Sequence, residues 1–134
     1  MEPEHIERNA APTLELWSFG FKYGAIDAQL LVDVRFLPNP YYVPSLCHMT
    51  GKDSACAAHV FKDPGSSAFA ATLTDLIHAM VRSSLEQGKK SLKVAVGCTG
   101  GQHRSVAVVE SLAASLRAAG VDLSIHHREL KVAS

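Results

Sequence analysis

The sequence predicts an α/β domain with a mostly parallel sheet of about four strands. Short apolar strand patterns alternate with amphipathic helix patterns along the chain, and this alternation is typical of parallel strands joined by helical crossovers. A glycine-rich turn lies between a strand pattern and a helix pattern at 97–105, as in many folds of this class. We therefore expect a single three-layer domain.

Length, composition and charge exclude several classes of protein. The 134 residues, 47% of them hydrophobic, are enough for one domain with a core of its own. We divide the chain into a flexible leader at 1–12, the domain at 13–130 and a short tail at 131–134. Thirteen basic and thirteen acidic side chains cancel, so net charge gives no attraction to nucleic acid or to a membrane surface.

The cellular compartment is predicted from the chain start and the cysteines. No apolar run approaches the ~20 residues of a membrane span, so we expect no membrane partner. The start of the chain is polar and lacks the apolar region of a signal peptide. Three cysteines, an odd number, then indicate reduced thiols in the cytoplasm.

The first half of the domain begins with two strand patterns. Alternation over Thr13–Phe19 predicts the first strand. The continuous apolar run Leu30–Val34 predicts a second strand that is buried on both faces. Three prolines within Pro38–Pro44 exclude regular helix, so this segment is predicted to be a stiff loop.

Helix and strand patterns alternate through the rest of the chain. A short helix is predicted over Asp53–Lys62, followed by a longer helix that Ser66 caps and that ends near Gln87. The remaining predicted elements are a strand at Leu92–Val96, a helix at His103–Ala119 and a strand at Val121–His127.

The turn at Gly97–Ser105 predicts an anion-binding site. A strand, a glycine-rich turn and a helix start direct several backbone N–H groups at one point, where the helix dipole adds partial positive charge. Gly100 and Gly101 allow the backbone angles of such a nest, and Arg104 offers a planar fork of donors for a phosphate. Further donors are Thr99, Gln102, His103 and Ser105. The alternative is a tight connection whose glycines serve only the turn.

Polar residues also follow the other predicted strands, at the sheet edge where ligands of open α/β sheets bind. Asp33 and Arg35 end the second strand, either to contact a ligand or to brace a neighbouring loop as a pair. His126 and His127 lie at the end of the last strand. Because adjacent strand residues face opposite ways, at most one of these histidines can reach a shared site.

The same turn fits the pattern C-x-x-G-x-x-R-[ST] of cysteine-dependent phosphatases. In that chemistry Cys98 would attack phosphorus while Arg104 and the loop amides hold the phosphoryl oxygens. The residue before the cysteine is Gly97, where those phosphatases usually carry histidine. The alternative for Cys98 is a small buried side chain that closes the strand.

Metal and nucleotide cofactors are not expected. Cys47, His48, Cys56 and His59 are zinc-ligand types in a short span, but the paired spacing of zinc sites is absent. The Walker pattern of P-loop enzymes is absent as well.

Four segments carry a family resemblance. Ser18–Gly24, Asp33–Tyr42, Gly97–Ser105 and His127-Arg128 resemble the C-terminal domain of the RNase adapter protein RapZ family, over roughly residues 13–130. The resemblance implies a domain that binds glucosamine 6-phosphate with this turn, forms homodimers or higher homo-oligomers, and acts as a regulatory adapter for RNA. The ligand set it implies is Asp33, Arg35, Tyr41 in the place of a family histidine, Thr99, Gly100, Gly101, His103 and Arg104.

Two departures from the family limit what is carried over. The full-length family has an N-terminal P-loop kinase-like domain, so the ATP binding attributed to the family is not expected of this chain. RNA-binding relatives carry a basic tail, whereas this chain ends in Glu129–Ser134, so the counterion-release contribution to RNA affinity is expected to be small. Lys89, Lys90 and Lys93 are the candidates for a local basic patch.

The sequence thus predicts a sensor for a phosphorylated small molecule, such as an amino-sugar phosphate. A cysteine-dependent phosphatase using Cys98 and Arg104 and an RNA-binding adapter are the alternatives.

Overall fold

Four parallel strands form one sheet in the order β2-β3-β1-β4. The computed structural model describes residues 13–131, so the leader predicted at 1–12 and residues 132–134 of the tail lie outside the described part. The strands are β1 (Thr13–Gly20), β2 (Leu30–Asp33), β3 (Ser91–Cys98) and β4 (Leu123–His127). The α/β class and the parallel sheet that the sequence predicts are confirmed.

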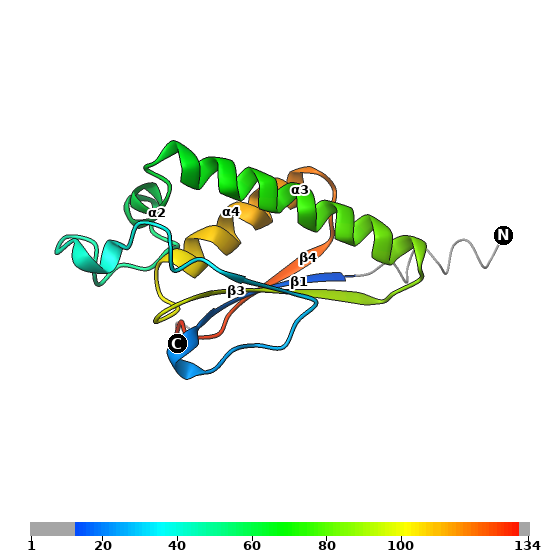
Figure 1. Cartoon of the computed structure of the whole chain (residues 1–134), viewed down its shortest axis with the longest axis horizontal. Helices are drawn as coiled ribbons and strands as arrows, with labels where there is room; N and C mark the ends of the chain where they lie inside the picture. The colour runs from blue at the N-terminus through cyan, green and yellow to red at the C-terminus, as the bar shows by residue number, and fades with distance from the viewer. Residues whose placement is uncertain (1–12, 132–134) are drawn as a thin grey trace.

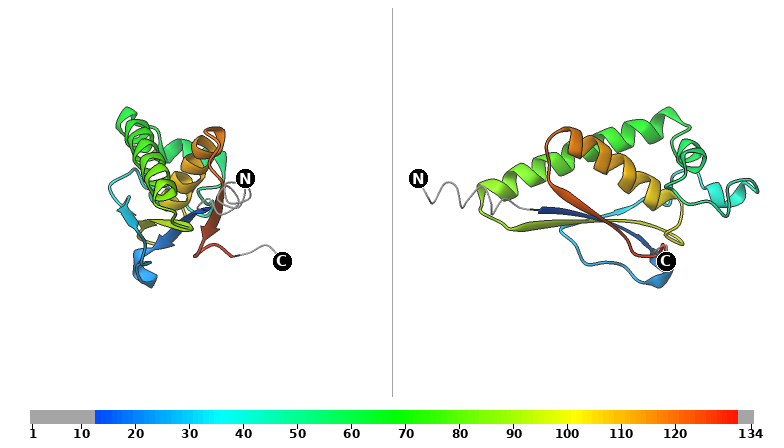
Figure 2. Two further views of the ribbon diagram at one scale, coloured as in Figure 1. Left: turned by 90° about the vertical axis from the view of Figure 1, so that its right-hand side faces the viewer. Right: turned by 180° about the vertical axis from the view of Figure 1, so that it is seen from behind.

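Three α-helices lie on one face of the sheet, as Figure 1 and Figure 2 show. They are α2 (Ser54–Val60), α3 (Pro64–Glu86) and α4 (Arg104–Ala118). Two short 3-10 turns, η1 (Phe21–Tyr23) and η2 (Pro40–Tyr42), follow β1 and β2. In the described part of the chain, no helix is both long and apolar enough to cross a membrane.

The order of the strands explains which face each connection covers. The connections from β2 to β3 and from β3 to β4 step across the sheet in one direction, and the connection from β1 to β2 steps in the other. Because crossovers between parallel strands keep one hand, connections that step in opposite directions cover opposite faces. The segment 21–29 accordingly runs along the face opposite the helices (Figure 1), and it makes the third layer.

The core is divided by the sheet into two clusters. Alternate residues of β1 and β3 point to opposite faces, as the pleat requires. The larger cluster lies under the helices and includes Leu16, Val94, Val96, Ile77 and Leu112, all fully buried. The smaller cluster lies under the segment 21–29 and consists of Phe19, Ile26 and Ala95, with Trp17 and Phe21 packed against it.

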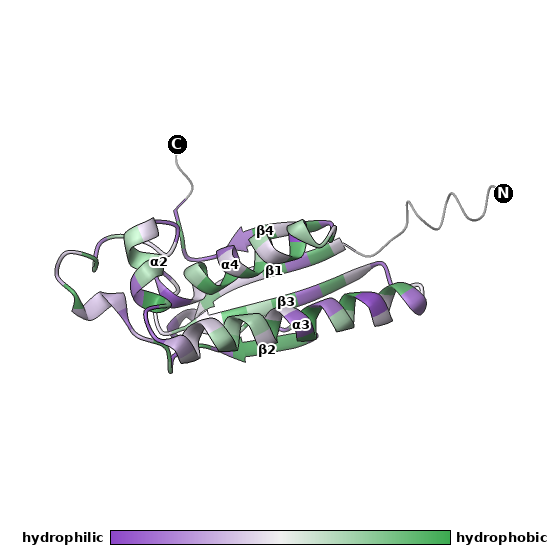
Figure 3. Ribbon diagram, turned by 90° about the horizontal axis from the view of Figure 1, so that it is seen from above, coloured by the Kyte–Doolittle hydropathy of each residue, from purple (hydrophilic) through white to green (hydrophobic). Residues whose placement is uncertain are grey.

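The prediction that the second strand is buried on both faces is wrong. β2 pairs only with β3 and is therefore an edge strand. Leu31 is 40% exposed, and Leu30 and Val32 are only partly buried. Figure 3 shows this apolar strand at the side of the sheet next to α3. An apolar run alone does not distinguish a central strand from an apolar edge.

The prediction that Ser66 caps the long helix is also wrong. The helix begins at Pro64 after the N-cap residue Asp63, and Ser66 lies buried inside its first turn. Proline suits the first helical position because its fixed φ is already helical and it has no N–H to leave unpaired. The remaining predicted elements differ from the structure by a few residues at their ends.

Candidate functional site

A cavity of about 300 Å³ opens at the carboxyl ends of three strands. Its walls come from the connections that follow β1, β2 and β3, which meet at one end of the molecule in Figure 1. The lining residues are Lys22, Tyr23, Asn39, Tyr41, Tyr42, Cys98, Thr99, Gly100, Gln102, His103 and Arg104. Six of them belong to the ligand set that the sequence predicts, namely Tyr41, Thr99, Gly100, Gln102, His103 and Arg104.

The 98–104 loop, which connects β3 to α4, is packed backbone to backbone against the end of β1. A Cβ atom on Gly20 would lie 2.5 Å from the carbonyl carbon of Gly100. Gly101 has a φ of 76°, and a Cβ atom there would lie 2.6 Å from the Gly20 nitrogen. Both positions therefore require glycine, because a side chain would separate the loop from the strand. Gly101 supports the loop from behind and does not line the cavity.

The start of α4 leaves backbone donors for a ligand. His103 is the N-cap residue of this helix, and its side chain makes no capping hydrogen bond. The first N–H groups of an α-helix have no partner within the helix, and the dipole makes this end partly positive. The loop and the helix start together form the kind of site that binds anions.

Arg104 is the buried cation of the site, with only 6% of its surface exposed. Its Nη1 donates to the carbonyl oxygens of Arg35 and Leu37, and its Nη2 lies 3.5 Å from Thr99 Oγ1. Its Nε is also buried and has no hydrogen-bond partner among the described residues. A buried guanidinium N–H without an acceptor is costly, so an anion in the cavity that accepted from Nε would be strongly stabilised.

His103 and Gln102 line the cavity but also hold neighbouring segments. The Nε2 atom of His103 donates to the Cys47 carbonyl oxygen at 2.9 Å. The backbone N–H of Gly51 donates to the Gln102 carbonyl oxygen at 2.9 Å. These two bonds fix the 43–53 segment against the 98–104 loop.

Ser105 lies behind the cavity, in contact with Cys98. It is fully buried and does not line the cavity. Its backbone N–H donates to Cys98 Sγ at 3.4 Å, and its hydroxyl lies 3.1 Å from the same sulfur. Cys98 lines the cavity although it is only 3% exposed. The Cys98 sulfur thus takes part in hydrogen bonding, and the side chain does more than fill space at the end of the strand.

Asp33 and Arg35 pair with each other and do not line the cavity. Arg35 Nε donates to Asp33 Oδ1 at 3.0 Å and Arg35 Nη2 donates to Oδ2 at 2.7 Å. The Arg35 guanidinium lies 4.2 Å from the centre of the Phe21 ring. Hydrogen bonds from Arg35 lower the pKa of the Asp33 carboxyl and outweigh the opposite effect of its partial burial. The pair lies at the end of β2 and the start of the connection that follows it.

Four lining residues were missed by sequence reasoning: Lys22, Tyr23, Asn39 and Tyr42. The Lys22 N–H donates to the Thr99 carbonyl oxygen at 3.2 Å, and its Nζ lies 5.1 Å from the centre of the Tyr23 ring. Tyr42 packs edge-on against Tyr41 at 5.4 Å, and both rings are mostly exposed. Lys22 and Tyr23 follow the first strand directly, and this position is the signal that could have found them, whereas Asn39 and Tyr42 lie six and more residues after the end of β2.

The segment after β4 supports the 98–104 loop from outside the cavity. Glu129 Oε2 accepts from the Gly20 N–H at 2.9 Å, and the Glu129 carbonyl oxygen accepts from Gln102 Nε2 at 2.9 Å. His127 and His126 face opposite ways, as expected. His127 bonds Ser18 and Glu110 on the helix side, and His126 stacks on Trp17 on the other side.

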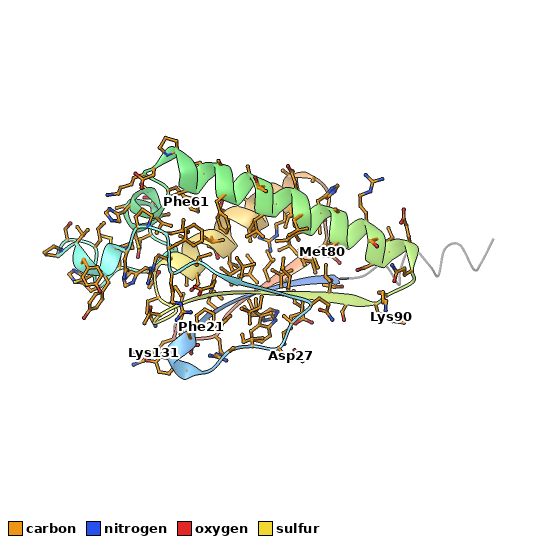
Figure 4. All side chains as sticks on the ribbon, in the orientation of Figure 1. Phe21, Asp27, Phe61, Met80, Lys90 and Lys131 are labelled. Carbon is orange, nitrogen blue, oxygen red and sulfur yellow. The ribbon has the colours of Figure 1, made fainter. Side chains whose placement is uncertain are left out.

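The candidate basic patch lies away from the cavity. In Figure 4, Phe21 and Lys131 are labelled at the cavity end of the molecule and Lys90 at the opposite end. Lys93 places its Nζ 4.7 Å from the centre of the Trp17 ring. Metal ligands are not gathered either: within residues 13–131, no group of three or more His, Cys, Asp or Glu side chains is placed to hold an ion.

Comparison with known proteins identifies relatives across almost the whole described chain. The family model for the RapZ C-terminal domain matches residues 12–131. A protein named "Nucleotide-binding protein" from Limosilactobacillus reuteri (strain DSM 20016) is 44% identical over 121 residues, which cover 90% of this chain and 42% of the relative. A relative of the same name from Salinispora arenicola is 51% identical, and the match covers 84% of this chain and 39% of the relative. Another from Trichlorobacter lovleyi is 42% identical, and the match covers 89% of this chain and 42% of the relative. The chain thus spans about two fifths of the length of these relatives.

Proposed function

The chain belongs to the family of RapZ C-terminal domains, and on this premise we propose that it is a regulatory binding domain whose cavity holds the phosphate group of a small molecule. The observation that carries the proposal is Arg104, a buried cation that lines the cavity and whose Nε has no hydrogen-bond partner among the described residues. A phosphate oxygen would supply the missing acceptor. The free N–H groups of the 98–104 loop and of the α4 start would hold the remaining oxygens.

The ligand we propose is an amino-sugar phosphate such as glucosamine 6-phosphate. Lys22 adds a second cation to the wall, which suits the double negative charge of a phosphate monoester. Tyr41 and Tyr42 offer exposed ring faces at the same cavity, against which the apolar face of a sugar can pack. Asp33 is an ionised carboxylate at the last position of β2, and an ammonium group of the ligand would complement it once Arg35 moves aside.

A nucleotide is the second candidate ligand. The relatives in Limosilactobacillus reuteri and Salinispora arenicola are named nucleotide-binding proteins, although this chain spans only about two fifths of each. The rings of Tyr41 and Tyr42, 62% and 79% exposed, are the observation that favours it, because exposed aromatic rings stack on nucleobases. The phosphate contacts would be the same for both ligands.

Calorimetric titration distinguishes these ligands. Glucosamine 6-phosphate, glucosamine, inorganic phosphate and adenosine monophosphate are titrated into the protein and into its Lys22→Gln variant. We expect saturable binding of glucosamine 6-phosphate, weaker binding of inorganic phosphate, none of glucosamine, and about a tenfold loss in Lys22→Gln. The exposed Lys62 does not line the cavity, so Lys62→Gln is the matched control and keeps wild-type affinity.

Two results would change the proposal. Tighter binding of adenosine monophosphate than of the sugar phosphate would favour the nucleotide. Equal binding of glucosamine and glucosamine 6-phosphate would remove the phosphate from recognition and overturn the proposal.

Self-association, RNA binding and a cytoplasmic location stay predictions. Leu31 and Phe36 are exposed at and after the edge strand β2, which supports self-association at this edge. Light scattering of the protein and of its Phe36→Ser variant measures the oligomer. For RNA, an affinity that falls with salt and on replacing Lys89, Lys90 and Lys93 by Gln would support the adapter role.

A further inference from the structure

Cys98 is a nucleophile-type side chain that phosphate binding does not need, yet it lines the cavity where the phosphate is proposed to bind. The backbone N–H of Ser105 donates to its sulfur, and the Ser105 hydroxyl lies 3.1 Å away. Because the N–H bond uses the sulfur as an acceptor, the hydroxyl can donate to it as well. A hydrogen bond from the Ser105 N–H, with the Ser105 hydroxyl and the positive end of α4 beside it, holds the sulfur at the cavity and suits a nucleophile that attacks as an anion.

Arg104 follows Cys98 by six positions and reaches the same cavity from the start of α4. Its guanidinium, whose Nε has no partner within residues 13–131, and the loop amides would hold the phosphoryl oxygens in the cavity that Cys98 also lines. The Cys98 sulfur, the Arg104 guanidinium and the backbone donors therefore all belong to the segment 98–105, and both side chains are buried where this segment lines the cavity. These are the groups required for attack of a thiolate on a bound phosphoryl group.

From this arrangement we infer that the cavity transfers the phosphoryl group of a bound aryl or acyl phosphate to Cys98 and that water then slowly hydrolyses the phosphorylated cysteine. This inference rests on the proposed function, because the phosphorylated substrate must first bind at the cavity. In the first step the thiolate forms an S–P bond while the P–O bond to the leaving group breaks, and the leaving oxygen takes the electron pair. In the second step water attacks phosphorus, the S–P bond breaks, and the thiolate and dihydrogen phosphate are released.

The class of substrate follows from the absence of a carboxylic acid in the described lining. Among the described residues that line the cavity there is no Asp or Glu, so no carboxylic acid is placed to protonate a leaving group. An alkoxide leaving from a sugar phosphate needs such a proton, whereas a phenolate or a carboxylate does not. The reaction is therefore expected with aryl and acyl phosphates, while sugar phosphates bind and are not cleaved. One cavity can in this way retain a sugar phosphate as a signal and turn over an activated phosphate.

The test uses p-nitrophenyl phosphate and acetyl phosphate as probes. Turnover is measured by released phosphate, and the phosphorylated cysteine is sought by intact mass after rapid quenching. We expect Cys98→Ser to lose turnover by on the order of 10² or more, to lose the adduct, and to keep calorimetric binding of inorganic phosphate. Cys47→Ser is the matched control, since Cys47 is the more exposed thiol and does not line the cavity. It is expected to behave as wild type.

The outcomes separate this inference from the proposed function. Binding of phosphate without any adduct or turnover in the wild type would overturn the inference and leave the proposed function standing. Turnover that survives in a folded Cys98→Ser variant would also overturn it, as would turnover lost equally in Cys47→Ser. Absence of both binding and turnover would overturn both proposals. Thermal unfolding of each variant checks that the fold is intact.

Discussion

The guanidinium of Arg104 donates a hydrogen bond to the backbone carbonyl oxygen of Arg35, which ties the start of α4 to the connection after β2. The same guanidinium donates to the Leu37 carbonyl oxygen, while its Nε has no partner among the described residues. One buried side chain thus holds two segments of the cavity wall in place and still offers a free donor to a ligand.

Replacing Arg104 by lysine tests both roles together. An ammonium is a single point donor and cannot bond two carbonyls and a phosphate in one plane. Arg104→Lys is expected to weaken glucosamine 6-phosphate binding by roughly 10–100-fold and to lower the free energy of unfolding by about 1–3 kcal/mol. Calorimetry and thermal unfolding measure the two effects. Arg82→Lys, on the exposed side of α3, is the control, and an equal loss there would contradict the assignment.

Gly100 and Gly101 are expected to respond differently to alanine. Gly100 lines the cavity, has no positive φ, and has open space where a Cβ atom would stand. Gly100→Ala should keep the melting temperature and weaken ligand binding, because the methyl group enters the cavity. Gly101→Ala should instead destabilise the fold by about 1–3 kcal/mol, because φ is positive and Gly20 is too close. Equal effects of the two substitutions on unfolding would contradict this account.

The pair of Asp33 and Arg35 predicts a small loss of stability in acid. Hydrogen bonds from Arg35 hold the pKa of Asp33 below its usual 3.8. A carboxyl with a lowered folded-state pKa stabilises the fold above its unfolded-state pKa, and this contribution disappears as the pH falls through the folded value. The effect is small because both side chains are about half exposed. NMR titration measures the pKa of the Asp33 carboxyl. In the Arg35→Met variant this pKa is expected to rise, and an unchanged pKa would contradict the pairing.

Glu129 is expected to act on the site without touching the ligand. Its carboxylate accepts from the Gly20 N–H behind the 98–104 loop. Glu129→Ala leaves this N–H without its acceptor and should cost about 1–3 kcal/mol of unfolding free energy, with weaker ligand binding as the loop loosens. Glu129→Gln keeps an acceptor oxygen and should recover most of both quantities. No recovery in Glu129→Gln would mean that the charge, and not the hydrogen bond, is what matters.

Local sequence patterns were enough to predict the class of fold and the central loop. Periodicity and short apolar runs locate the strands and α-helices to within a few residues, because a pleat and an α-helix repeat at different intervals. The glycine-rich turn 97–105 could be recognised because its chemistry lies within one continuous segment. The ends of elements do not follow from periodicity: the long helix begins at Pro64 and not at the predicted serine cap.

The rest depends on long-range packing that no local pattern contains. Whether the apolar run of β2 is central or at an edge depends on strand order, which follows from the whole set of crossovers. Lys22 and Tyr42 reach the cavity only because the connections after β1 and β2 end beside the 98–104 loop. Asp33 was expected near the ligand, but its bonds to Arg35 could be found only from side-chain geometry.

The most direct test of the central claim, that the 98–104 loop and Arg104 bind a phosphate group, is a crystal structure of the protein with glucosamine 6-phosphate. We expect the phosphate in the cavity, with one oxygen accepting from Arg104 Nε and others accepting from the loop N–H groups. A ligand bound at another surface while the cavity holds only water would contradict the claim.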